Sequence, residues 1–248
     1  MEEFLICRLF EGIPRQGPGD NENTEKAFRM IPKFPKNAKI LDIGCGKGMQ
    51  TIALAKLCPD CHITATDIYQ PFLDALSKNA KEEGLLERIT TLCASMDNLP
   101  FEKEEFDVIW AEGSIFITGF ENGINYWKKF LKHGGYMSVS DLVKFKEVLS
   151  KDVTDFLNLC SPDILNEEET LMTIKKAGLE TIAMFKLPEN VWHESFYNYM
   201  KENNKILREE YKDNPDALSI IDFNDLEIKV YSKHADEYGY TYFIIRKP

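Results

Sequence analysis

Apolar residues in the first 145 positions come in short β-rich runs that alternate with amphipathic segments. The predicted strands are residues 39–44, 62–68, 88–95, 106–113 and 136–142. The predicted helices are residues 49–57, 71–84 and 121–135, and glycines end the last two. Because strands that alternate with helices form βαβ units, the pattern predicts an α/β fold with a parallel sheet.

The pattern changes beyond residue 145. Asn166 is a predicted N-cap for a helix over 166–178, with Glu169 three residues later in the capping-box position. Residues 179–187 and 240–248 read as strands, and the long stretch between them is rich in helix-forming residues. Two strands separated in this way predict an antiparallel pair interrupted by a helical insertion.

The chain is interpreted as one domain over residues 1–248, because no Pro/Gly/Ser-rich linker divides it. Residues 38–145 would form the core that binds a cofactor. The helical segments 1–37, 143–178 and 188–238 would decorate this core and form an acceptor pocket or lid.

Charge and composition exclude several classes of function. The net charge of −11 and the lack of a Lys/Arg-rich run argue against a nucleic-acid partner. No apolar run is long enough to cross a membrane, and the start of the chain lacks the pattern of a signal peptide. We therefore expect no membrane association, a cytoplasmic location and six cysteines that stay reduced. The sequence leaves the oligomeric state open.

A glycine-rich stretch, "LDIGCGKGMQ" at 41–50, joins the first predicted strand to its helix. Such a turn presents backbone N–H groups and a helix N-terminus to a ligand. Gly44, Gly46 and Gly48 alternate, and Met49 stands where a dinucleotide-binding GxGxxG motif requires glycine. The spacing therefore favours a ligand without a pyrophosphate.

Two carboxylates and a polar loop extend this candidate site. Asp42 precedes the first glycine and could reach a cationic group of the ligand. Asp67 ends the second predicted strand, where it could accept hydrogen bonds from both hydroxyls of a ribose or cap the next helix. Ser95 and Met96, in "CASMDNLPF" (93–101), could contact an adenine by a hydrogen bond and by apolar packing.

"ILDIGCGKG", Asp67 and "SMDNLPF" together resemble the S-adenosylmethionine-binding motifs of class I methyltransferases. This resemblance implies a seven-stranded, mainly parallel sheet with one antiparallel strand and helices on both faces. It also implies that Gly44, Cys45 and Gly46 line the methionine part of the cofactor and that Asp42 helps to hold its ammonium group. Asp67 would bind the ribose, with Ser95 and Met96 beside the adenine.

Two further segments, "RQGPGDNENTEKAF" (15–28) and "EGSIFITGF" (112–120), resemble small bacterial methyltransferases whose substrates are uncharacterised. That resemblance places a rigid Gly-Pro-Gly turn and a helix beside the cofactor. The (N/D)PP(Y/F) motif of nucleobase amino methyltransferases is absent after the fourth strand, where the chain reads "WAEGSIF".

Glu112, at the end of the fourth predicted strand, is the candidate catalytic residue, and a carboxylate that only caps the following loop is the alternative. "CPDCH" (58–62) lacks the second pair of ligands that a structural zinc site requires, so no metal is expected. The predicted function is S-adenosylmethionine-dependent methylation of a small molecule. The alternatives are a protein methyltransferase, a non-catalytic cofactor-binding module and an NAD-dependent oxidoreductase.

Overall fold

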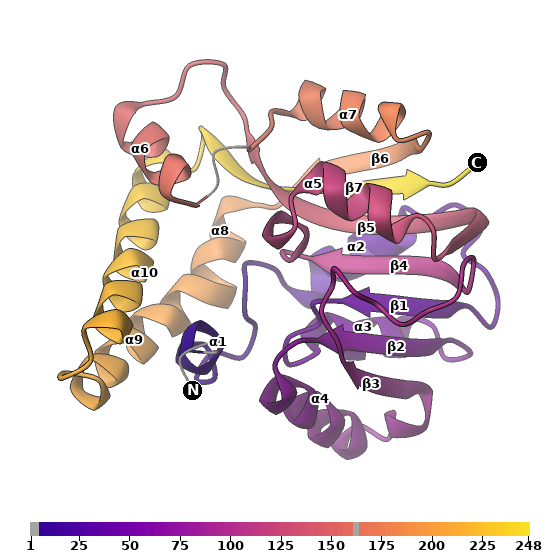
Figure 1. Cartoon of the computed structure of the whole chain (residues 1–248), viewed down its shortest axis with the longest axis horizontal. Helices are drawn as coiled ribbons and strands as arrows, with labels where there is room; N and C mark the ends of the chain where they lie inside the picture. Colours follow the sequence, from indigo (N-terminus) through magenta and orange to yellow (C-terminus); the bar gives the residue numbers. More distant parts are fainter. Residues whose placement is uncertain (1–4, 161–163) are drawn as a thin grey trace.

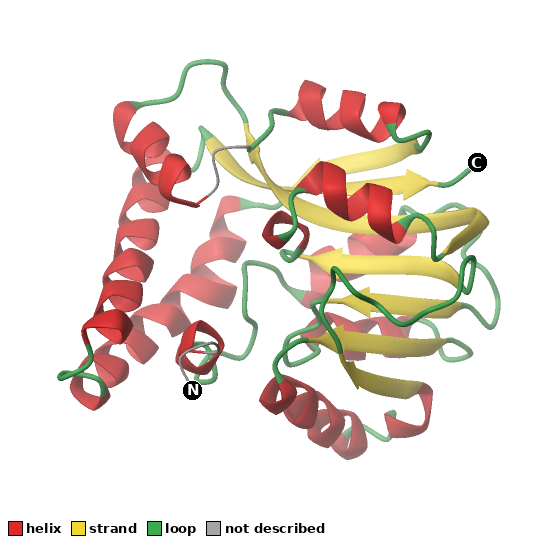
Figure 2. Cartoon of the chain, viewed as in Figure 1, coloured by secondary structure: helices red, strands yellow, loops and turns green. Residues whose placement is uncertain are grey.

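The computed structural model describes residues 5–160 and 164–248, which form one seven-stranded sheet with helices on both faces (Figures 1 and 2). Residues 1–4 and 161–163, within the expected decorations 1–37 and 143–178, lie outside this description. The strands are β1 (Lys39–Ile43), β2 (His62–Asp67), β3 (Ile89–Cys93), β4 (Phe106–Glu112), β5 (Leu131–Lys144), β6 (Glu180–Lys186) and β7 (Tyr238–Arg246).

Helices and turns precede and connect these strands. The α-helices are α1 (Leu5–Leu9), α2 (Asn21–Arg29), α3 (Met49–Leu57), α4 (Gln70–Glu82), α5 (Phe120–Trp127), α6 (Lys151–Cys160), α7 (Glu167–Lys176), α8 (Glu189–Val191), α9 (Asn198–Glu210) and α10 (Pro215–His234). Tighter or wider turns complete the set at η2 (Leu86–Arg88), η3 (Ile115–Ile117) and η4 (Trp192–Tyr197). Asn166 and Glu169 form the predicted capping box at the start of α7.

The sheet has the order β3-β2-β1-β4-β5-β7-β6. Strands β1 to β5 pair in parallel, whereas β7 runs antiparallel to both β5 and β6. This confirms the expected sheet with one antiparallel strand, and it also confirms the predicted pairing of the two C-terminal strands. Because the chain order reverses at β1 and β4, the carboxyl ends of these two strands border the crevice in which open α/β sheets bind ligands.

Two apolar layers hold the helices against the sheet. Leu54 of α3 and Leu76 of α4 are buried in the cluster on one face. Ile124 and Trp127 of α5 and Ile174 of α7 are buried in the cluster on the other face. Helix α7 also packs against β6, so this part of the segment 143–178 covers the sheet.

A group of helices stands beyond the carboxyl ends of the parallel strands (Figure 1). Helix α10 packs against α6, α9 and α1. Leu9, Leu207 and Ile221 form a small apolar cluster where α1, α9 and α10 meet. The segments 1–37, 143–178 and 188–238 therefore meet at the edge of the sheet where a ligand is expected.

The predicted helix over 121–135 is wrong in its second half. Helix α5 ends at Trp127, and β5 already begins at Leu131, which pairs with Phe106. The register then shifts before Val108 pairs with Tyr136. Gly134, with φ of 77°, and Gly135, where a Cβ would lie 2.8 Å from the carbonyl oxygen of Asp107, occupy this bulge. The two glycines shape a strand bulge and do not end a helix.

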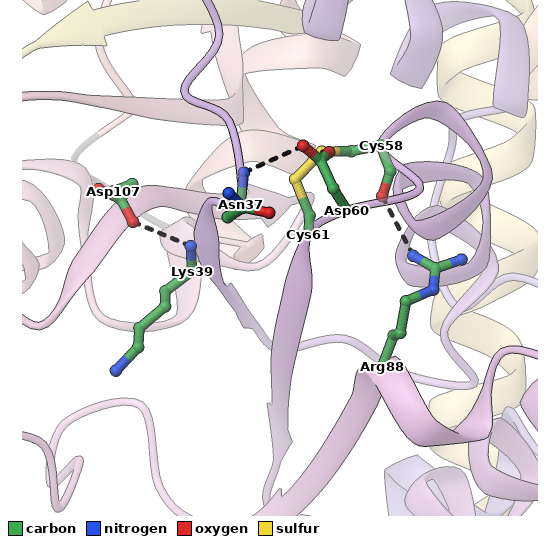
Figure 3. Close-up of a disulfide and its surroundings, with 7 residues drawn as sticks. All are labelled: Asn37, Lys39, Cys58, Asp60, Cys61, Arg88 and Asp107. Carbon is green, nitrogen blue, oxygen red and sulfur yellow. Dashed lines mark hydrogen bonds between the residues drawn. A yellow bond between two sulfur atoms is a disulfide. The ribbon is translucent and has the colours of Figure 1, made fainter.

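A disulfide joins Cys58 and Cys61 in the turn between α3 and β2 (Figure 3). The N–H of Cys61 donates to the carbonyl of Cys58, and this turn brings the two Cα atoms to 5.4 Å, a usual separation for a disulfide. The expectation that the cysteines stay reduced is therefore wrong for this pair. Asp60 lies beside the sulfurs, where it accepts a hydrogen bond from the N–H of Asn37 at 3.2 Å. The turn lies at the start of β2, at the opposite end of that strand from Asp67.

Within residues 5–160 and 164–248, no helix combines the length and the apolar character needed to cross a membrane.

Candidate functional site

The glycine-rich loop leaves β1 at Ile43 and enters α3 at Met49. Gly44, Gly46 and Gly48 have φ values of 70°, 53° and 76°, in the left-handed region that favours glycine. A Cβ on Gly44 would lie 2.6 Å from the Cβ of Ser114, so the loop also passes close to the chain after β4. The three glycines therefore meet both a conformational and a steric requirement.

Hydrogen bonds to β2 fix the conformation of this loop. The N–H groups of Gly44 and Cys45 donate to the carbonyl of Thr66 at 2.8 and 2.9 Å. Asp67 Oδ2 accepts from the N–H of Gly46 at 2.9 Å, and Oδ1 accepts from the N–H of Tyr69 at 2.9 Å. Burial raises the pKa of Asp67, and the two N–H donors act in the opposite direction.

Asp42 lies beneath the loop and lines neither of the two cavities described below. Its side chain is fully buried, where Oδ2 accepts from Thr51 Oγ1 at 2.5 Å and Oδ1 accepts from Gln50 Nε2 at 3.5 Å. Burial raises its pKa to about 7, although Thr51 and Gln50 favour the charged form. Gln50 Nε2 also donates to the carbonyl of Cys45, so Asp42 supports the loop through this side chain.

Ser95 and Met96 follow β3, and they differ in their contacts with the loop. Met96 Cε lies 3.4 Å from the Cβ position of Gly44, and the carbonyl of Met96 accepts from Trp127 Nε1 at 3.0 Å. Ser95 Oγ accepts from the N–H of Asp97 at 3.4 Å. Asp67, Ser95 and Met96 do not line either cavity described below.

Glu112 ends β4, and its carboxylate is buried among donors. Oε1 accepts from Trp110 Nε1 and from Thr24 Oγ1, both at 2.8 Å. Oε2 pairs with a guanidinium nitrogen of Arg15 at 3.3 Å, and the Glu112 side chain is 5% exposed. These contacts tie the N-terminal segment to the end of β4, and the capping of Gly113 falls to Ser140, which accepts its N–H at 2.8 Å.

The segment Arg15–Pro18 covers the glycine-rich loop. Gln16 Oε1 accepts from the N–H of Lys47 at 2.8 Å, and its amide donates to the carbonyl of Ile13. A cavity of about 50 Å³ lies beneath this cover. The residues that line it are Arg15, Gln16, Gly17, Pro18, Gly44, Cys45, Gly46, Met49, Gln50, Glu112 and Gly113.

A second cavity of about 1020 Å³ adjoins the first, and the two share Gln16, Gly17, Pro18 and Gly113. Its wall comes from the sheet edge and from the expected decorations on three sides. Phe10 belongs to the segment 1–37 and Phe156 belongs to the segment 143–178. The segment 188–238 contributes Trp192 and Phe196. Its volume is at the upper end of the range for small-molecule sites.

Three carboxylates that line the large cavity were not among the residues predicted from the sequence, and two of them, Asp141 and Glu227, are shielded from solvent. Asp141, on β5, is 8% exposed, and Glu227, on α10, is partly buried. Burial raises the pKa of each to about 7. The only sequence signal for Asp141 was its place as an acidic residue within an apolar strand. Glu227 gave no signal, because a charged residue on a helix is usually exposed to solvent. The aromatic residues Trp192 and Phe196 also line this cavity.

Comparison with known proteins gives matches in sequence and in fold. Residues 40–135 match a family model described as a methyltransferase domain. Ribosomal protein L11 methyltransferase of Campylobacter concisus (strain 13826) is 32% identical over 148 residues, which cover 58% of this chain and 49% of the relative. Malonyl-[acyl-carrier protein] O-methyltransferase of Herminiimonas arsenicoxydans is 29% identical over 116 residues, covering 46% and 40%. The chain thus spans about half the length of the curated relatives it matches.

A solved structure matches nearly the whole chain. The S-adenosylmethionine-dependent methyltransferase from Geobacter sulfurreducens, in complex with S-adenosyl-L-homocysteine, superposes with a TM-score of 0.81 at 18% identity and covers 98% of both chains. At this level of identity the likeness concerns the fold.

Proposed function

We propose that this chain binds S-adenosylmethionine and methylates a small molecule, because residues 40–135 match a methyltransferase-domain model and the chain has the class I methyltransferase fold. The observation that carries the proposal is the junction of the two cavities. Gln16, Gly17, Pro18 and Gly113 border both, so a ligand on the glycine-rich loop would meet a ligand in the large cavity.

The loop residues would hold the cofactor by different parts. Gly44, Cys45 and Gly46 border the small cavity and would contact the methionine part. Asp67, with lone pairs left beside its two backbone donors, would accept the ribose hydroxyls, and Ser95 and Met96 would flank the adenine. Asp42 would contribute through Gln50 and Thr51, since its carboxylate faces them and not the cavity.

The cover Arg15–Pro18 has to yield for the cofactor to enter. A cavity of about 50 Å³ is smaller than the sites that hold drug-sized ligands. In addition, Gln16 Oε1 accepts the hydrogen bond that the N–H of Lys47 would otherwise donate to a ligand. We therefore expect Gln16 to leave Lys47 on binding and the segment to close again over the ligand.

When bound, the cofactor supplies an activated methyl group on a sulfonium sulfur, so alignment of the acceptor accounts for much of the rate. The chain would provide that alignment through the large cavity and through the cover that excludes water. Glu112 would act as a positioning residue, because its two oxygens already engage Trp110, Thr24 and Arg15.

The small-molecule acceptor is favoured by the shape of the large cavity. Helices from three segments surround it, and aromatic residues form much of its wall. The name of one relative gives a ribosomal protein as the acceptor, and the name of another gives a malonyl group bound to a carrier protein. The relatives therefore do not decide between a protein acceptor and a small-molecule acceptor.

Replacing Asp67 by alanine is expected to weaken S-adenosylmethionine binding by about 10- to 100-fold, because a charge-assisted contact to the ribose and the support of Gly46 are both lost. Isothermal titration calorimetry on the full chain measures the dissociation constant. Asp74→Ala, on the exposed face of α4, is the matched control and should bind as the original protein does. Equal binding by Asp67→Ala would contradict the ribose assignment.

The acceptor class is tested with S-adenosylmethionine labelled on its methyl group, added to the purified protein and a size-fractionated cell extract. Label in the low-mass fraction, lost with Asp67→Ala, is the expected result. Label in protein would replace the small-molecule acceptor by a protein acceptor. Cofactor binding without any transfer would favour a binding module, and binding of NADH in place of S-adenosylmethionine would favour an oxidoreductase.

A further inference from the structure

The charged side chains among the described residues that line the large cavity are all acidic. Three of the described residues that line it are acidic: Glu121, Asp141 and Glu227. None of the described lining residues is Lys, Arg or His. No salt bridge among residues 5–160 and 164–248 involves Asp141 or Glu227, so neither carboxylate has a cationic partner in this part of the chain. A buried charge without a partner is costly, and such groups are commonly found where a ligand completes the site.

Asp141 presents an unpaired oxygen. Its Oδ1 is fully buried and has no hydrogen-bond partner among the described residues. The residue is 8% exposed and lines the cavity from β5, one position beyond Ser140, which pairs with Glu112. Glu112 also borders the small cavity. Asp141 therefore lies near the junction of the two cavities, where the methyl acceptor is expected.

Glu227 faces the same cavity from α10, among aromatic rings. Tyr197 donates to its Oε1 at 2.9 Å. Phe156, which also lines the cavity, stacks on Phe223 with ring centroids 5.6 Å apart and lies 6.2 Å from the ring of Tyr238. The hydroxyl of Tyr238 is buried and has no hydrogen-bond partner in the described part of the chain, so it could accept a hydrogen bond from a ligand N–H.

Both carboxylates act electrostatically on Tyr240. It lines the cavity, and the negative charges of both Glu227 and Asp141 help to raise its pKa. Both carboxylates are therefore within electrostatic reach of one ring. Carboxylates together with aromatic faces are the arrangement by which proteins bind organic cations.

We propose that the methyl acceptor is an organic amine with an apolar body, bound as its ammonium ion by Asp141 and Glu227 while the aromatic wall covers the rest of the molecule. The claim that the amine is methylated rests on the proposed function. The claim that the cavity binds an amine does not depend on that function. The proposal concerns recognition, and the ammonium group is the anchor of the ligand.

The competing explanation assigns the two carboxylates to the cofactor, whose sulfonium and ammonium groups are also cations. That explanation requires Asp141 and Glu227 to affect the affinity for S-adenosylmethionine, whereas the amine proposal requires them to affect only the second ligand. The same variants therefore separate the two.

The test uses three probes with one apolar body and different charges: 4-phenylbutylamine, 4-phenylbutanol and 4-phenylbutyrate. Their binding to the full chain is measured by calorimetry at pH 8, with and without saturating S-adenosyl-L-homocysteine. We expect the amine to bind at least about tenfold more tightly than the alcohol, and the carboxylate to bind most weakly, because only the amine pairs with the carboxylates.

Asp141→Asn and Glu227→Gln are expected to reduce amine binding by about tenfold each and to leave alcohol binding unchanged. Glu121→Gln is the matched control, because Glu121 lines the cavity but is exposed at the start of α5. Circular dichroism and thermal unfolding check that each variant is folded. A preference for the alcohol or the carboxylate, or no binding of any probe, would overturn the proposal.

The same titrations keep this proposal distinct from the proposed function. If Asp141→Asn weakens binding of S-adenosylmethionine and not of the amine, the carboxylates serve the cofactor and the amine proposal fails. If the original protein binds the amine with the expected preference but does not bind S-adenosylmethionine, the proposed function fails and the amine site stands.

Discussion

Replacing Glu112 by alanine is expected to lower the free energy of unfolding by about 3–5 kcal/mol and to abolish cofactor binding. The substitution leaves the Arg15 guanidinium, which is 8% exposed, without a carboxylate. It also removes the acceptor for Trp110 Nε1 and Thr24 Oγ1. Urea unfolding of the original protein and the variant measures the first effect, and calorimetric titration with S-adenosylmethionine measures the second.

A double-mutant cycle checks the cause of this loss. Arg15→Ala combined with Glu112→Ala removes both charges, so the double variant should be less destabilised than the sum of the two single variants. Additive losses would show that the pair contributes nothing beyond the packing of its side chains.

Glu112→Gln separates a positioning role from proton transfer. Glutamine keeps the size of the side chain and an acceptor oxygen, so a positioning residue should lose part of kcat/KM while the pH–rate profile keeps its shape. Loss of one limb of that profile in a variant of unchanged stability would identify Glu112 as a general base.

Acidification from pH 7 to pH 5 is expected to stabilise the free protein. Burial raises the pKa of Asp42, Asp141 and Glu227 to about 7. In the unfolded chain these groups ionise near pH 4, so between about pH 4 and pH 7 the folded state binds more protons than the unfolded state. Stability is therefore lost as the pH rises through this window, by about 1.4 kcal/mol per pH unit for each group.

Desolvation accounts for the raised pKa of each carboxyl, because most of the neighbouring groups favour the charged form. Thr51, Gln50 and Arg15 favour the charged form of Asp42, and Glu112 opposes it. The backbone of Leu142 favours charged Asp141, and Tyr197 favours charged Glu227. Desolvation is the largest cause in all three cases.

Urea unfolding at pH 5.5, 6.0 and 6.5 measures how the free energy of unfolding changes with pH. The other titrating groups are the same in all variants, so differences between variants come from the substituted carboxyl. Asp141→Asn should remove the contribution of that carboxyl, reduce the slope by about 1.4 kcal/mol per pH unit and stabilise the protein at pH 8. Asp74→Asn, which changes an exposed carboxyl, should leave the slope as it is. A slope that is the same with and without Asp141 would contradict the burial argument.

Local patterns predicted that the glycine-rich loop and Asp67 lie at the same edge of the sheet. Gly44, Gly46 and Gly48 follow β1 directly, and Asp67 ends the adjacent strand, so the order of strand, turn and helix is enough to bring them together. The strand count and the antiparallel pair of β6 and β7 also follow from apolar runs. The error at 131–135 arose because a glycine pair can end a helix or shape a strand bulge, and pairing with β4 decides which.

Contacts between distant positions were not visible in the sequence. Arg15 pairs with Glu112 across 97 positions, and nothing in either local pattern indicates the other. Asp141 interrupts an apolar strand, but its place in the cavity depends on helices that come later in the chain. The disulfide was missed because the prediction considered the redox state of the cell and not the turn that brings Cys58 and Cys61 together.

The position of β7 has a consequence for the order in which the protein is assembled during synthesis. β7 lies between β5 and β6, although residues 238–246 are translated after all other elements. β1 to β5 can pair as they emerge from the ribosome, but β6 has no neighbour in the sheet until β7 arrives. Tyr238 and Tyr240 reach the large cavity on this same strand. The nascent chain can therefore build the glycine-rich loop early, whereas the wall of the large cavity is completed only when β7 joins the sheet.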